Sequence, residues 1–182
     1  LIYSLKAIKN VGGPVIDRIV KEREENGRFE SISDFIRRMG SKDVNKRAVE
    51  NFIKAGAFDS LGGNRKQYIQ VYEMLIDDVI AERKKLDSNQ MTIFDMLPKE
   101  DKKAMEIKLP NVEEFPKDMI LQMEREVLGV YISGHPLEDV KDIWKKNITA
   151  VSSDFIYQAE LEGSCLPDKK QVKIGGIVTN LN

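Results

Sequence analysis

The sequence predicts a mainly α-helical fold, and three of its features support this prediction. Apolar residues recur at helical spacing along most of the chain, glycine-containing turns separate these stretches, and one run near the end, residues 172–181, is rich in β-branched residues. An apolar content of 41% supports a buried core, and 32% charged residues of mixed sign are typical of a globular rather than a disordered protein. The 182 residues are enough for one or two small domains.

The first two helices are marked by their terminal residues. Pro14 suits the first position of a helix, and Gly27 is the predicted end of that helix. Ser31 and Asp34 have the spacing of a capping box, which predicts that a second, short helix begins there and runs to Gly40.

Two further helices follow. Asn45 is a predicted cap of the third helix, which ends at Gly56. After a turn over residues 59–64, the strongest predicted helix of the chain runs from about Arg65 to Lys85. Its apolar stripe consists of Tyr68, Val71, Tyr72, Leu75, Ile76, Val79 and Ile80.

The remainder of the chain is more broken. Charged residues interrupt the pattern between residues 86 and 110, which predicts a long linker. A helix begins at Pro116, with an expected buried side of Met119, Ile120, Met123, Val127 and Tyr131. A turn at residues 133–136 and one more helix precede a strand in which Val172, Ile174 and Val178 share one face. A single strand is not stable alone, so we expect partner strands beyond Asn182 and regard the chain as a piece of a longer protein.

Positive charge is concentrated at one end of the chain. Residues 1–66 contain 14 lysine and arginine residues against 9 aspartate and glutamate residues, whereas the rest contains 15 against 21. The net charge of −1 does not by itself indicate a nucleic-acid partner. Its distribution predicts that any contact with DNA lies in the first third of the chain.

The segment of residues 8–16 combines a tight turn with the start of a helix. Asn10 and Gly12 tolerate positive φ angles, and a glycine-rich turn before a helix leaves backbone N–H groups without partners. Such donors, together with the positive end of the helix dipole, suit a phosphate group. This is the arrangement of a helix-hairpin-helix motif, which binds duplex DNA without sequence preference. An ordinary corner between two helices is the alternative.

A second, degenerate copy of this arrangement lies at residues 48–65, where Gly62 and Gly63 again precede a helix. The two copies predict a tandem DNA-binding unit in which Val11 anchors the first turn. The predicted DNA-binding residues are Lys9, Asn10, Val11, Gly12 and Gly13 in the first hairpin and Gly62, Gly63, Asn64 and Arg65 in the second. Whether the hairpin carbonyls also hold a monovalent cation stays open.

Four stretches of the sequence resemble the C-terminal region of bacterial DNA polymerase III alpha subunits. Residues 5–12 and residues 44–59 resemble the helix-hairpin-helix region of that family, and residues 172–179 resemble the first strand of its OB domain. Residues 126–137, which read EVLGVYISGHPL, are the most specific of the four. The resemblance extends over essentially the whole chain.

This resemblance implies a segment that holds newly made duplex DNA and contacts the rest of the alpha subunit and other replisome subunits. The family's catalytic aspartates belong to a palm domain, of which this sequence shows no motif, so we expect no catalytic residues here although the parent protein resembles a nucleotidyltransferase. The predicted organisation is a tandem helix-hairpin-helix domain at residues 1–85, a linker at 86–111, a helical connector at 112–148 and the start of a truncated OB domain at 149–182.

The linker contains a short motif, Gln90-Met91-Thr92-Ile93-Phe94. A glutamine followed three residues later by an aliphatic-aromatic pair has the form of a peptide that docks on the bacterial sliding clamp (beta subunit), and the resembled family carries its clamp-binding motif here. Burial of Ile93 and Phe94 would contribute roughly 1.5–3 kcal/mol each. A hydrophobic loop on the protein's own surface is the alternative.

Other classes of site have little support in the sequence. One histidine, His135, and one cysteine, Cys165, cannot form an ordinary zinc site or an internal disulfide, so we expect no metal and no cofactor. No window is apolar enough to span a membrane, and we expect a cytoplasmic location. Two other functions remain open: a protein–protein adaptor built on the same helices, and a nuclease or glycosylase, for which a catalytic constellation is not visible.

Overall fold

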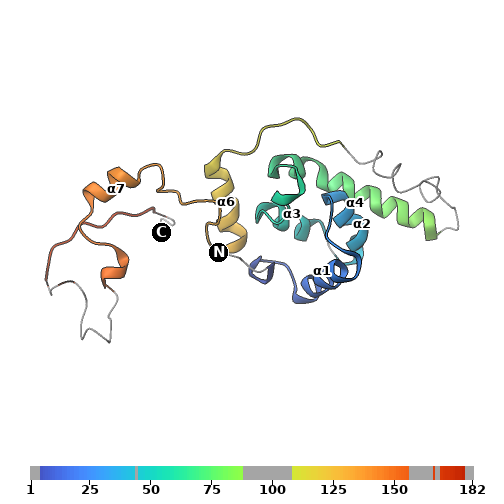
Figure 1. The fold of residues 1–182 in the computed structure, drawn as a ribbon, viewed down its shortest axis with the longest axis horizontal. Coiled ribbons are helices and arrows are strands. Elements are labelled where there is room, and N and C mark those ends of the chain that lie inside the picture. Colours follow the sequence, from blue (N-terminus) through green and yellow to red (C-terminus); the bar gives the residue numbers. More distant parts are fainter. Residues whose placement is uncertain (1–4, 44, 88–107, 156–165, 167–168, 179–182) are drawn as a thin grey trace. The chain divides into compact units, whose positions relative to one another are not determined.

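The computed structural model describes residues 5–43, 45–87, 108–155, 166 and 169–178 (Figure 1). Six α-helices occur in these residues, as the mainly α prediction requires. They are α1 (Gly13–Asn26), α2 (Ile32–Asp43), α3 (Lys46–Lys54), α4 (Arg65–Asp87), α6 (Lys117–Leu128) and α7 (Lys141–Asn147), with 3-10 helices η1 (Leu5–Ala7), η2 (Asp59–Leu61) and η4 (Ser152–Phe155). The chain divides into two units, residues 1–133 and residues 134–182.

Most of the ends of α1, α2 and α3 follow the predicted signals. Gly27 follows α1 with a φ of 81°, a conformation that glycine adopts without a steric penalty. At the start of α2, the Asp34 N–H donates to Ser31 Oγ at 3.1 Å. Gly40, the predicted end of this helix, interrupts it with a non-helical φ of 68°, and three more residues follow to Asp43. The Asn45 side chain accepts from the Ala48 N–H at 2.8 Å and caps α3. Local sequence therefore determines these boundaries.

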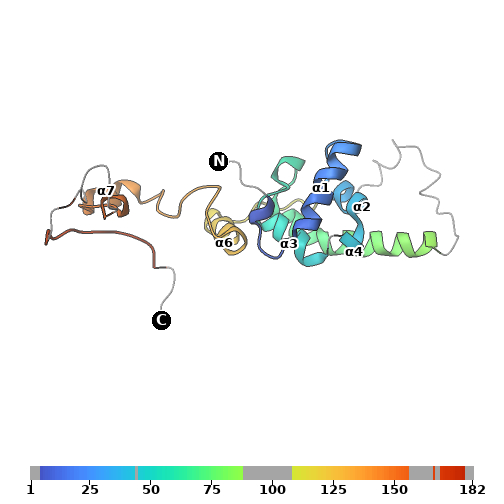
Figure 2. The same cartoon turned by 90° about the horizontal axis from the view of Figure 1, so that it is seen from below.

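The core of the first unit lies where α4 contacts both α2 and α3, and these helices run beside one another in both views (Figures 1 and 2). Phe35, Phe52 and Phe58 meet edge to face in this core, with ring centroids 5.0–6.2 Å apart, and Tyr68 joins them. The predicted stripe of α4 supplies most of the facing surface, because Tyr68, Val71, Tyr72, Leu75, Ile76 and Val79 are all buried.

Helix α6 also belongs to the first unit, and its buried face agrees with the predicted one in part, since Val127 is buried and Ile120 and Met123 are half-buried. The buried residues are Leu121, Glu124 and Val127, whereas Met119 is 43% exposed. The hydrophobic pattern missed Glu124 because the most deeply buried position of the helix carries a glutamate, which a long-range ion pair stabilises.

The division at residue 133 falls within the predicted connector of residues 112–148, because α6 contacts α3 while α7 lies in the second unit. Residues 88–107 of the predicted linker lie outside the described residues, and α4 continues to Asp87. The remaining domain boundaries stay predictions.

The second unit contains α7, η4 and an extended segment at residues 170–178. The described part of this segment forms no strand, so the predicted first strand of an OB domain is not shown. Lys173 is hydrogen-bonded to Thr149 and Ala150, and the Trp144 indole N–H donates to Gly175 O at 2.9 Å. Within the described residues, no further backbone hydrogen bonds pair residues 174–178 with another segment. Ile174 and Val178 are largely exposed.

Candidate nucleic-acid interface

The first hairpin connects η1 to α1 through a tight turn. Asn10 has a φ of 62°, which confirms the expectation that this position adopts a left-handed conformation. Val11 is half-buried against the core, in the anchoring role predicted for it. Gly12 is the N-cap of α1, and Pro14 lies in the first turn of the helix.

Two residues distant in sequence hold this hairpin in place. The Lys9 N–H donates to Val127 O at 2.8 Å, and Lys9 O accepts from Asn51 Nδ2, also at 2.8 Å. Asn51 is only 6% exposed, so its amide group is committed to this contact. The sequence reasoning missed Asn51 and Val127, because nothing local to α3 or α6 indicates that either would support a hairpin at residue 9.

The outer side of the hairpin presents unused donors on an open surface. Gly12 and Gly13 are exposed, and among the described residues their N–H groups donate to no protein acceptor. A Cβ atom at Gly13 would meet no protein atom within 4 Å, and Gly13 has no positive φ. The protein's own packing therefore does not require glycine at position 13, but the close approach of another molecule's backbone would. The exposed Lys9 side chain lies on the same hairpin.

The second hairpin has the predicted shape, but the backbone N–H groups of residues 63–66 already donate to acceptors within the protein. Gly62 has a φ of 82°, and the Gly63 N–H donates to Tyr68 Oη at 2.8 Å. Asn64 and Gln67 cap each other, each backbone N–H donating to the other's side chain. A Cβ atom at Gly63 would lie 2.6 Å from Leu109 Cδ1, so this glycine is required by internal packing.

Glu114 occupies the N-terminus of α4. Its carboxylate accepts from the Arg65 N–H at 2.8 Å and the Lys66 N–H at 3.1 Å, in the position where we expected a phosphate. The surrounding segment, residues 109–115, is held by hydrogen bonds from Gln67 to Pro110 O and from Asn64 to Val112 O. In this structure the protein's own carboxylate fills the second anion site.

The Arg65 side chain points into the protein instead of toward solvent. It is 3% exposed and pairs with Asp59 at 2.8 Å and with Glu124 at 3.0 Å. Burial alone would lower the pKa of Arg65, but the two carboxylates outweigh it and raise that pKa. Arg65 is therefore placed as a structural residue, and the geometry argues against our expectation that it contacts DNA.

Glu124 links this arginine to the loop after α6, which contains Ile132 and Ser133. It is fully buried and accepts from the N–H groups of Ile132 and Ser133 at 2.7 and 2.9 Å, and from the Ser133 hydroxyl. Burial by itself raises the pKa of Glu124, and these hydrogen bonds together with Arg65 hold it below its ordinary value. Within residues 126–137, the network therefore uses the Ser133 side chain and the backbone N–H groups of Ile132 and Ser133.

The other predicted sites receive no structural description or no support. Residues 90–94 and Cys165 lie outside the described residues. His135 Nδ1 accepts from the Leu137 N–H at 3.1 Å, as expected for a turn residue. Across the described ranges, no group of histidine, cysteine and acidic residues is arranged to hold a metal ion, and no helix is long and apolar enough to cross a membrane.

Comparison with known proteins finds a family model that matches the part of the chain containing both hairpins. The sequence model of the helix-hairpin-helix motif family matches residues 1–68. This range includes the first hairpin, the second hairpin and the first turn of α4.

Curated relatives extend this similarity over nearly the whole chain. The chain is 40% identical over 151 residues to the DNA polymerase III subunit alpha of Borreliella burgdorferi, which covers 83% of this chain and 13% of that protein. It is 34% identical over 186 residues to the DNA polymerase III subunit alpha of Mycobacterium tuberculosis strain H37Rv, covering 99% of this chain and 15% of that protein. The chain thus spans about a seventh of the length of these relatives.

Proposed function

Because the chain is homologous to a segment of bacterial DNA polymerase III alpha subunits, we propose that it binds duplex DNA as a non-catalytic part of such a polymerase. In this role it would hold the duplex in the cytoplasm while another part of the polymerase, absent from these residues, extends the primer. The binding would be independent of DNA sequence, since backbone amides contact phosphates and do not read bases.

The observation that carries this proposal is the open, donor-rich surface of the first hairpin. The unpaired N–H groups of Gly12 and Gly13 lie at the N-terminus of α1, where the helix dipole favours an anion. Lys9 adds a positive charge beside them. We assign DNA contact to Lys9 through Gly13, and regard the predicted contacts of Gly63, Asn64 and Arg65 as replaced by internal ones. The predicted contact of Gly62 stays a prediction.

Substitution of Gly13 tests the proposal without disturbing the fold. A leucine at this position meets no protein atom near its Cβ, so stability should be unchanged, but its side chain would fill the space that a phosphate must enter. Loss of one charge-assisted hydrogen bond, about 1.5–3 kcal/mol, predicts affinity for duplex DNA weaker by roughly tenfold or more. Gly176→Leu is the matched control, since Gly176 is equally open and has no positive φ.

Fluorescence anisotropy with a labelled duplex of mixed sequence measures the effect. If Gly13→Leu binds as well as Gly176→Leu, the first hairpin is not the contact surface. If the unsubstituted chain fails to bind duplex DNA even at low salt, the adaptor function becomes the better account of these helices.

We further propose that Gln90-Met91-Thr92-Ile93-Phe94 docks on a sliding clamp. The support is the spacing of glutamine and the aliphatic-aromatic pair, together with the homology to polymerase III alpha subunits. Tethering through DNA would strengthen such a contact by raising the effective concentration of the motif near the clamp.

An Ile93→Ala, Phe94→Ala double substitution should weaken binding to the clamp ring by about 100-fold or more, because two buried apolar side chains contribute roughly 1.5–3 kcal/mol each. Surface plasmon resonance with immobilised clamp measures this. The control is Met96→Ala, Leu97→Ala in the same stretch of sequence. Equal binding by both double variants would exclude the motif as the docking site.

A further inference from the structure

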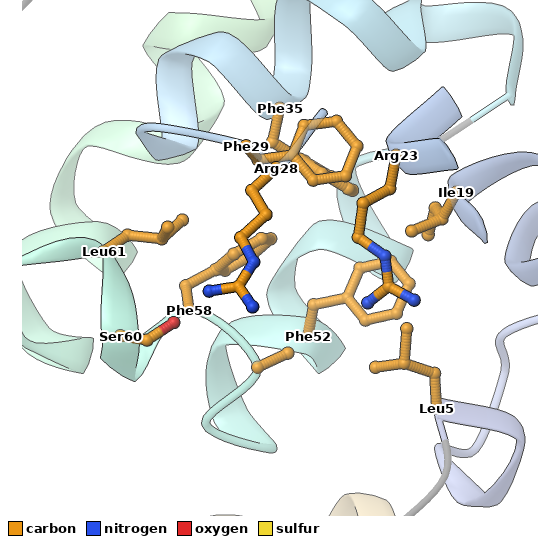
Figure 3. A pocket seen from close by; sticks show the side chains of 11 residues that line it. Leu5, Ile19, Arg23, Arg28, Phe29, Phe35, Phe52, Phe58, Ser60 and Leu61 are labelled. Atoms are coloured by element: carbon orange, nitrogen blue, oxygen red, sulfur yellow. The ribbon is translucent and has the colours of Figure 1, made fainter. Parts of the chain in front are cut away.

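An apolar pocket lies in the first unit, and none of the residues Lys9 to Gly13 proposed to contact DNA lines it. Its volume is about 330 Å³, and residues of η1, α1, α2, α3 and η2 line it (Figure 3). The floor is formed by core side chains, among them Ile19, Phe52 and Phe58. This volume is sufficient for one large apolar side chain.

Two arginines, Arg23 and Arg28, stand at the mouth of this pocket, and Figure 3 shows both side chains extending over it. Both residues are exposed, and neither guanidinium forms a hydrogen bond or ion pair among the described residues. Arg38, close by, is different: it pairs with Glu22 at 2.9 Å and Asp34 at 3.3 Å. The chain thus neutralises one arginine of this region and leaves two available beside an apolar surface.

We propose that this pocket binds an acidic peptide segment of a partner protein, with one aromatic or aliphatic side chain in the pocket and carboxylates on Arg23 and Arg28. The arginine fork suits a carboxylate, to which it can donate two parallel hydrogen bonds. The apolar floor suits a side chain that loses its hydration shell on binding. Duplex DNA does not fit both features, because its bases are stacked and would have to flip out to reach the floor.

This site is separate from the hairpin and does not depend on the proposed DNA binding. Gly13 and Arg23 are ten residues apart on α1, about 15 Å along the helix axis at 1.5 Å per residue. One surface can therefore hold a phosphate backbone while the other holds a peptide, and a variant of either site leaves the other intact.

A labelled peptide with a central phenylalanine between two pairs of aspartates is a suitable probe for the full 182-residue chain. Fluorescence anisotropy measures its affinity, and NMR of protein carrying ¹³C-labelled phenylalanine rings locates it. Replacing the probe's phenylalanine with alanine should weaken binding about tenfold or more, from the loss of a buried apolar side chain. Arg23→Gln and Arg28→Gln should each weaken it about two- to fivefold, as rim ion pairs do.

A control variant, Arg47→Gln, Lys146→Gln, removes two positive charges from exposed positions elsewhere and should leave the affinity unchanged. If the alanine peptide binds as tightly as the phenylalanine peptide, charge alone accounts for binding and the proposal is overturned. Unshifted ring signals of Phe52 and Phe58 would also overturn it. The proposal also fails if a single-stranded oligonucleotide shifts those rings in an Arg23-dependent way, which would assign the pocket to nucleic acid. A self-associated chain whose pocket rings are protected by a second copy would likewise contradict it.

Discussion

Replacing Glu124 with glutamine should destabilise the first unit by about 3–5 kcal/mol. The two carboxylate oxygens of Glu124 together accept from four donors, on Arg65, Ile132 and Ser133, in a fully buried position. Glutamine has the same shape but only one acceptor oxygen. If that oxygen keeps the two backbone N–H groups, the new NH₂ group faces the Arg65 guanidinium, donor against donor.

The magnitude follows from these contacts. The two backbone hydrogen bonds change from charge-assisted to neutral, at about 1 kcal/mol each, and one charged hydrogen bond from Arg65 is lost, at about 1.5–3 kcal/mol. Breaking a buried ion pair usually costs about 3–5 kcal/mol. The cost stays within this range because Arg65 keeps Asp59 at 2.8 Å and Lys54 O at 3.1 Å.

Urea unfolding followed by circular dichroism measures the change. Glu126→Gln is the control on the same helix, since the Glu126 side chain is 61% exposed and its carboxylate pairs with the Lys54 ammonium at the surface. This substitution should change the free energy of unfolding by less than about 0.5 kcal/mol. Similar stability of Glu124→Gln and the unsubstituted chain, or an equal loss in both variants, would refute the role assigned to the buried pair.

The difference in stability between the unsubstituted chain and Glu124→Gln should depend on pH. The pKa of folded Glu124 lies below its ordinary value of 4.5, so folding favours the ionised form. Its contribution to stability is full above pH 4.5 and is lost as the pH falls through the folded pKa. The stability difference between the unsubstituted chain and Glu124→Gln should therefore narrow in acid. If the difference in unfolding free energy between the two proteins stays constant from pH 7 to pH 3, the pKa of Glu124 is not lowered by folding.

Three further outcomes are expected. Glu114→Ala should lower the free energy of unfolding by about 1 kcal/mol, because it removes the acceptor at the N-terminus of α4, whereas Glu113→Ala should have no effect in the same urea titration. Asn51→Ala should lower the free energy of unfolding by about 1–2 kcal/mol and also weaken DNA binding, since Lys9 O loses its hydrogen bond. If the anisotropy with labelled duplex is unchanged, Asn51 does not support the DNA-binding hairpin. Burial, with the adjacent Glu73, raises the pKa of Tyr72 to about 12, so its ionisation in an absorbance titration should be displaced from pH 10, and the stability that it supplies should be lost between pH 10 and 12.

Local features of the fold were predictable because each is determined by neighbouring residues. Asn45 and Gly27 mark helix ends through their own backbone and side-chain chemistry, and the α4 stripe follows from the helical period. Asn10 adopts the left-handed conformation that a hairpin turn needs.

The carboxylates that bind the second hairpin could not be predicted. The sequence shows which backbone N–H groups a turn leaves without partners, but not which distant acceptor binds them. Glu114 binds the Arg65 N–H from 49 residues away, and Glu124 binds the Arg65 side chain from 59 residues away. The hydrophobic pattern of α6 likewise could not indicate that Glu124 would be buried. The two hairpins therefore look alike in sequence, but their backbone N–H groups differ in whether acceptors within the protein already bind them.

The most direct test of the account is the salt dependence of duplex DNA binding by the whole chain, measured beside Lys9→Glu and the charge-matched control Lys146→Glu. Affinity should fall steeply as salt rises, with a slope of about −0.9 per neutralised phosphate. Lys9→Glu should weaken binding and make the slope shallower by about 1, while Lys146→Glu should follow the unsubstituted chain. Salt-insensitive binding, or equal effects of the two substitutions, would contradict phosphate contact at the first hairpin.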